Sequence, residues 1–64
     1  MSGTGIGRLL TEEQLAETLQ VPAKTLRQWR YKGCGPAFCK VNKSLVRYRE
    51  QDVEAWIEQS RVVA

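Results

Sequence analysis

The chain has 64 residues and a formal net charge of +3, with two cysteines and no histidine. This length allows one small domain, whose core must draw much of its buried area from a few aromatic residues, and it leaves no room for a large substrate cleft. Two cysteines cannot complete a four-ligand zinc site without carboxylates. No signal peptide and no apolar stretch of membrane-spanning length is visible, so a reducing cytoplasm with free thiols is expected.

The charges are separated along the chain. Positions 24–49 contain eight basic residues and no acidic residue, whereas all seven acidic residues lie outside this span. A basic centre with acidic flanks is typical of a face that binds a polyanion and a back that faces solvent. The basic residues are Lys24, Arg27, Arg30, Lys32, Lys40, Lys43, Arg47 and Arg49.

Two helices are predicted in the first half, after a disordered lead-in at residues 1–7. Thr11 and Gln14 have the spacing of a capping box, and the apolar residues 15, 16 and 19 define one helical face. Pro22 ends this helix and starts a second one, which runs to Lys32 with Leu26 and Trp29 on its inner face. Gly33 stops the second helix.

A β-hairpin and a third helix are predicted in the second half. The hairpin has a turn at residues 42–44, and Cys39 and Val41 are expected on its inner face. The third helix begins at about residues 49–51 and has an apolar stripe of Val53, Trp56 and Ile57. Residues 8–60 are therefore expected to form a winged helix-turn-helix, mainly α with a small antiparallel β-hairpin, followed by a short tail at 61–64.

The second helix of a helix-turn-helix enters the major groove of DNA with its exposed face. Lys24, Gln28 and Tyr31 follow one helical line that is offset from the inner face, and Thr25 can add a hydroxyl contact. Gln28 can make two hydrogen bonds with adenine, and Lys24 can donate to guanine acceptors. We expect these four residues in the major groove.

Other cations are expected at the DNA backbone. Arg27, Arg30 and Lys32 flank the reading line, and Arg47 projects from the second strand of the hairpin on the face opposite Val46 and Tyr48. The hairpin turn, Asn42, Lys43 and Ser44, can lie along phosphates or enter a minor groove. With six phosphate contacts, the logarithm of the binding constant should fall with the logarithm of the salt concentration with a slope of roughly −5.

Each assignment has an alternative. The basic helix face can be merely solvated, Tyr31 can pack rather than touch DNA, and Arg49 can simply begin the third helix. Trp29 and Trp56 could stack on single-stranded bases, although their helical spacing favours the core. The two cysteines are expected to be buried or half-buried thiols, with an intermolecular metal or disulfide as the alternative.

Seven short motifs carry a resemblance to a known family, over residues 9–58. They are Leu10-Thr11 with Ala16, Val21, Thr25-Leu26 with Trp29, Gly33 with Gly35-Pro36, Lys40-Val41, Arg47-Tyr48, and Asp52-Val53 with Trp56. This pattern resembles the excisionase-like winged-helix family, relatives of the MerR-type DNA-binding domain. The chain departs from many relatives at Pro22-Ala23, where a serine cap is absent, and at Asn42, where glycine is common. Asparagine tolerates left-handed geometry, so we expect the turn to survive.

The resemblance implies a non-enzymatic protein without catalytic residues, cofactor or metal, and without a membrane or small-molecule partner. Phage excisionases of this type bind several adjacent attachment-site sequences, bend the DNA and assist an integrase. This predicts double-stranded DNA and a phage integrase as partners, self-association on adjacent sites, and a location at the bacterial nucleoid. The short chain, which has no effector domain, agrees with this role. A small transcriptional regulator is the first alternative, and a protein-binding adaptor that uses the acidic face of the third helix is the second.

Overall fold

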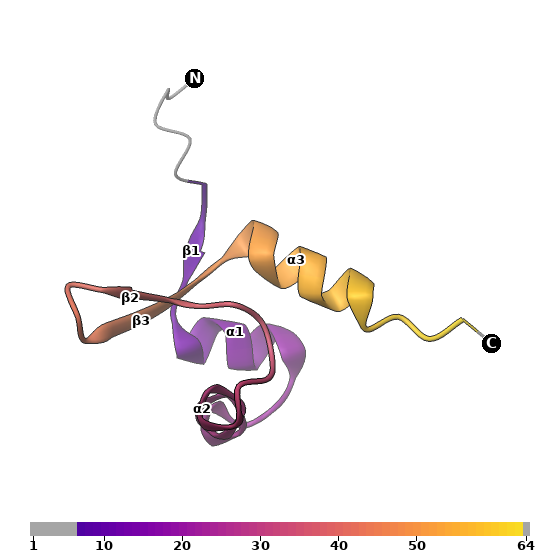
Figure 1. Ribbon diagram of the computed structural model, residues 1–64, viewed down its shortest axis with the longest axis horizontal. Helices are drawn as coiled ribbons and strands as arrows, with labels where there is room; N and C mark the ends of the chain where they lie inside the picture. Colours follow the sequence, from indigo (N-terminus) through magenta and orange to yellow (C-terminus); the bar gives the residue numbers. More distant parts are fainter. Residues whose placement is uncertain (1–6, 64) are drawn as a thin grey trace.

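The computed structural model describes residues 7–63, which form three helices and three short strands (Figure 1). In chain order these are β1 (Leu9–Leu10), α1 (Glu12–Leu19), α2 (Ala23–Lys32), β2 (Cys39–Val41), β3 (Leu45–Arg49) and α3 (Glu50–Gln59). The winged helix-turn-helix architecture is confirmed. The predicted disordered lead-in, residues 1–7, lies outside the described residues except for Gly7.

The wing is a three-stranded antiparallel sheet rather than a two-stranded hairpin. Its strand order is β1-β3-β2, so β3 is the central strand. Leu10 of β1 lies opposite Tyr48 of β3, and both side chains are buried. The Arg8 carbonyl also accepts a hydrogen bond of 2.9 Å from the backbone N–H of Glu50, the first residue of α3. The strand β1 therefore connects the sheet to α3.

The predicted boundaries of the first two helices are confirmed. The Thr11 hydroxyl accepts from the Gln14 backbone N–H at 3.1 Å, and the Thr11 N–H donates to the Gln14 side chain at 2.9 Å, which completes the capping box. Helix α1 ends at Gln20, which is left-handed with φ of 61°. Pro22 precedes α2 without any side-chain cap, as the sequence predicts.

The core lies where the helices meet the sheet. Leu15 and Leu26 are fully buried, and Tyr48 is 1% exposed. Trp29 and Trp56 pack on each other with ring centroids 5.5 Å apart, and Trp29 also contacts the core, which confirms the packing interpretation of both. The buried set is Leu10, Leu15, Ala16, Leu26, Tyr48 and Val53.

The predicted inner face of the hairpin is wrong by one residue. Strand pairing places Lys40 opposite Val46 and Cys39 opposite Arg47, so Lys40 shares the inner face with Val46 and Tyr48. Phe38 lies on the same side, with its ring centroid 6.2 Å from that of Tyr48. Cys39 and Val41 face outward and are exposed. Phe38 is thus the side chain of this segment that packs inward.

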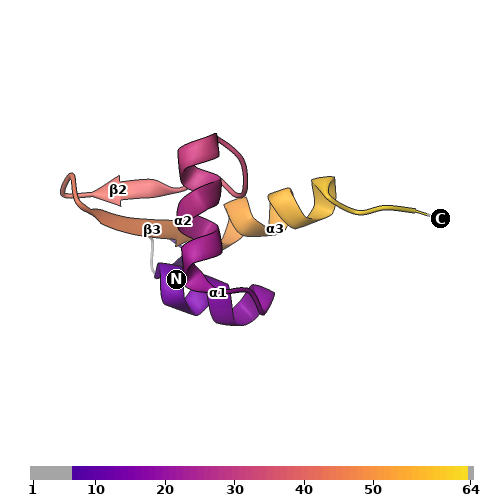
Figure 2. The same ribbon diagram turned by 90° about the horizontal axis from the view of Figure 1, so that it is seen from below.

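Helix α3 and the β2–β3 hairpin extend to opposite sides of the α1–α2 pair (Figures 1 and 2). Val53 is buried and Trp56 is half-buried, whereas Ile57 is 42% exposed. Of the predicted apolar stripe, Ile57 is thus the residue that the rest of the protein does not cover. Within residues 7–63 the helices are too short and too polar to cross a membrane.

We predict that replacing Gln20 with glycine stabilises the protein. A non-glycine residue in left-handed geometry carries a steric cost that glycine avoids, so Gln20→Gly should raise the free energy of unfolding by roughly 1 kcal/mol. Urea denaturation followed by circular dichroism measures this. Gln20→Ala keeps the Cβ atom and serves as the control. An equal gain in both variants would contradict the explanation.

Candidate nucleic-acid interface

The outer face of α2 is polar and accessible. Lys24, Gln28 and Lys32 are exposed, and Thr25 is half-buried at the first turn. Tyr31 is 93% exposed, so the alternative that it packs within the protein is wrong. Leu26 and Trp29, on the opposite side, anchor the helix to the core. The side chains expected in a DNA major groove therefore share an accessible face of one anchored helix.

The hairpin turn presents a second accessible group. Asn42 and Lys43 both have left-handed backbone geometry, with φ of 54° and 70°, and the Ser44 N–H donates to the Val41 carbonyl at 3.3 Å. Asn42 fits this geometry, as the sequence predicts, whereas a lysine at φ of 70° is strained. All three turn side chains are exposed. The turn therefore projects a cation and two small polar groups into solvent.

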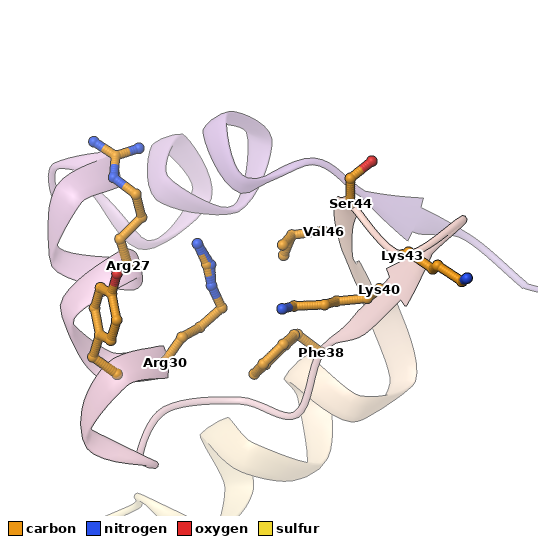
Figure 3. A pocket seen from close by; sticks show the side chains of 8 residues that line it. Arg27, Arg30, Phe38, Lys40, Lys43, Ser44 and Val46 are labelled. Carbon is orange, nitrogen blue, oxygen red and sulfur yellow. The ribbon is translucent and has the colours of Figure 1, made fainter.

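A groove of about 360 Å³ separates α2 from the hairpin (Figure 3). Four cations border it, two from each element, and its other side chains include two aromatic rings. The lining residues are Arg27, Arg30, Tyr31, Phe38, Lys40, Lys43, Ser44 and Val46. The groove thus joins the outer face of α2 to the hairpin turn, the two surfaces expected to contact DNA.

Glu12 neutralises part of this basic surface. Its carboxylate accepts a hydrogen bond from Arg27 Nη1 at 3.1 Å and lies 3.2 Å from Arg30 Nη2. The Glu12 side chain is only 12% exposed and that of Arg30 is 20% exposed. Because the start of α1 packs beside α2, Glu12 lies at the basic surface and not on the solvated back expected for the acidic flanks.

Arg30 is also held from the hairpin side. Its guanidinium carbon lies 5.6 Å from the centroid of the Phe38 ring, within the range of a cation–π contact. The ring of Phe38 in turn contacts Tyr48. Burial raises the pKa of Tyr48 above its ordinary value; Arg30 opposes this shift, and Glu12 adds to it. The raised pKa favours the neutral phenol of Tyr48, which is the most buried side chain of the sheet.

The structure does not bring the other two arginines of positions 24–49, Arg47 and Arg49, into the groove. Arg47 is half-buried, donates to the Val46 carbonyl at 2.8 Å, and lines a neighbouring hollow that also contains Glu12 and Glu13. Arg49 makes two hydrogen bonds to Asp52, at 2.8 and 2.9 Å. These bonds lower the pKa of Asp52 and raise that of Arg49. Arg49 therefore lies at the N-terminal cap of α3, directly before Glu50, which agrees with its interpretation as a residue of the helix start.

The cysteines differ from expectation. Cys34 and Cys39 are both free and both exposed, so the prediction of buried or half-buried thiols is wrong. Cys34 follows the glycine that ends α2, and Cys39 lies on the outward face of β2. Neither position offers a covering element among residues 7–63.

Sequence reasoning missed two residues of this surface. Glu12 carries no sequence signal for its role here, because its partners lie 15 or more positions away in the chain. Lys40 was assigned no contact, because the hairpin faces were reversed. The aromatic residue Phe38 lies two positions before Lys40 and so shares its face, and its large apolar side chain is the signal that could have identified the inner face.

Comparison with known proteins gives one family. A family model described as a helix-turn-helix domain matches residues 9–61, which is most of the chain. No curated protein and no solved structure gives a significant match. Domains of this family are typically not enzymes, and they imply binding to double-stranded DNA. The chain therefore belongs to the helix-turn-helix domain family.

Proposed function

We propose that this protein binds specific sequences of double-stranded DNA, with α2 in the major groove and the β2–β3 turn at the neighbouring minor groove. The observation that carries this is the continuity of one basic surface over both elements, with the groove between them (Figure 3). A helix fits the major groove, and a small turn with a cation suits the narrower minor groove. The strands of the hairpin are too short to act as the reading element themselves.

The exposed side chains of α2 divide into readers and anchors. Gln28 is suited to adenine and Lys24 to guanine, while Thr25 and Tyr31 lie close enough along the helix to join them. Lys32, Arg27 and Arg30 bind phosphates. The ion pairs of the two arginines do not prevent this, because a guanidinium has five N–H donors and Glu12 occupies few of them. At the turn, Asn42, Lys43 and Ser44 complete the contact.

We further propose that the biological role is that of a phage excisionase. The support is the resemblance of seven motifs to the excisionase-like family, together with a matching domain family that includes excisionase-like DNA-binding domains. A single domain of this size buries a modest DNA interface, so isolated binding is weak and several adjacent sites are needed. The protein binds and bends attachment-site DNA and assists an integrase.

Two experiments test the proposed role. Selection from a random duplex library, followed by footprinting on attachment-site DNA, checks sequence-specific binding by the folded protein. An excision assay with the neighbouring integrase then checks direction of recombination. Specific binding without any effect on excision would favour a transcriptional regulator, and a folded protein that binds no duplex would overturn both roles and favour an adaptor.

The division between readers and anchors gives a prediction. Gln28→Ala should weaken binding to the selected duplex by about 1–3 kcal/mol and leave binding to random duplex unchanged, because the lost bonds are to a base. Lys32→Ala should weaken both equally and reduce the salt slope by about 0.9. Fluorescence anisotropy across salt concentrations measures these effects. Arg61→Ala, which removes the same charge beyond the end of α3, is the control. If it lowers DNA affinity as much as Lys32→Ala does, the assignment of Lys32 to phosphate contact is wrong.

The strained β2–β3 turn gives a second prediction about DNA binding. Lys43→Gly relieves the left-handed geometry and removes the cation, so unfolding free energy should rise by roughly 1 kcal/mol while DNA affinity falls. Thermal denaturation and anisotropy together measure the two opposite changes. Lys43→Ala keeps the strain and loses only the charge. Affinity that stays at the wild-type value in both variants would remove the turn from the interface.

A further inference from the structure

The groove between α2 and the hairpin contains two cations whose charged ends share one space. Arg30 extends from α2 and Lys40 from β2, and both charged groups point into the hollow (Figure 3). Arg27 and Lys43 lie at its edges: Arg27 bonds to Glu12, and the Lys43 ammonium points away from the groove. Two like charges that face one interior space repel each other unless an anion lies between them.

The chain itself supplies no such anion on that side. Glu12 Oε2 lies 3.2 Å from Arg30 Nη2, and among residues 7–63 both this oxygen and the Nη1 atom of Arg30 are buried without a hydrogen-bond partner. None of the ion pairs within the described part of the chain involves Lys40. The residues that line the groove include Arg30 and Lys40 but no carboxylate, so an anion from outside is favoured between these two cations.

The walls of the groove strengthen the attraction for an anion. Phe38 packs against Arg30, and Val46 and Tyr31 add further apolar surface. Charged groups next to apolar surface interact more strongly than the same groups in open water. A tetrahedral oxyanion can accept from the fork of an arginine and from a lysine together. The chemistry of the groove is therefore that of a phosphate site, and its volume of about 360 Å³ also leaves space beside the anion.

We propose that Arg30 and Lys40 together bind a single phosphodiester of the DNA backbone in this groove. The inference rests on the proposed function. If α2 occupies a major groove and the hairpin turn the adjacent minor groove, the strand that separates the two grooves passes between these elements. Glu12 and Phe38 position Arg30 from either side, and Lys40 closes the site from the hairpin. The site fixes the position of the protein on DNA without reading a base.

Duplexes with one neutral methylphosphonate each, scanned along the selected sequence, test the assignment. With wild-type protein, replacement at one position should raise Kd roughly tenfold, the scale of a charge-assisted hydrogen-bond pair. The same replacement should raise the Kd of Lys40→Met by a clearly smaller factor, because only the contact with Arg30 is then lost. Lys43→Met is the matched control: it loses the same charge from the same hairpin, yet should still respond to that methylphosphonate.

Arg30→Lys supplies a second variant, since it keeps the charge and removes the fork; its response at that position should also be smaller than that of the wild-type protein. Lys40 is exposed, so Lys40→Met should keep the wild-type circular dichroism and melting curve. Duplex binding with no Lys40-dependent position overturns this inference and leaves the proposed function standing. No duplex binding overturns both. Lys40-dependent binding of inorganic phosphate alone, by NMR titration, would assign the site to free phosphate and overturn the DNA assignment.

Discussion

Strand β3 positions the other elements through its pairing and its two-residue alternation. It pairs with β1 on one edge and β2 on the other, and it runs into α3 without a connecting loop. The alternation directs Val46 and Tyr48 toward the helices and leaves Arg47 and Arg49 on the other face. A slip of one residue would expose Tyr48 and bury Arg47, so burial of Tyr48 specifies the register. The same register decides that Lys40, rather than Cys39, faces α2.

Arg30 connects this fold to its surface, because it packs against both the start of α1 and the hairpin. Withdrawing a guanidinium from water is costly, and the Glu12 carboxylate and the Phe38 ring offset that cost. Changes at Arg30 or Glu12 therefore alter folding and binding together. Lys24, Gln28 and Lys32 are exposed, so substitutions there leave the core intact and test the proposed DNA binding separately from folding. The basic surface thus contains structural cations and freely replaceable ones.

Local signals predicted the helices well. The Thr11–Gln14 capping box and Pro22 act within a few residues of their own position. Leu15 and Leu26 belong to apolar faces with helical spacing, each within its own helix, and both are buried. The hairpin faces were reversed because both faces carry apolar residues, so alternation alone does not distinguish them. Strand β1 is two residues long, too short for any periodicity. The Glu12 ion pairs arise only when α1 packs beside α2, which no local pattern contains.

The left-handed residues Gln20 and Lys43 lie at the two turns that set the geometry of the interface. Gln20 ends α1 and so fixes the direction in which α2 leaves it; nothing in the structure explains why glutamine rather than glycine stands there. Lys43 has an explanation in its charge, which glycine would remove from the hairpin turn. A small domain has little stability to spare, yet a bound polyanion stabilises the folded state by mass action. Strain at Lys43 is therefore best tolerated when the cation it presents is bound to DNA.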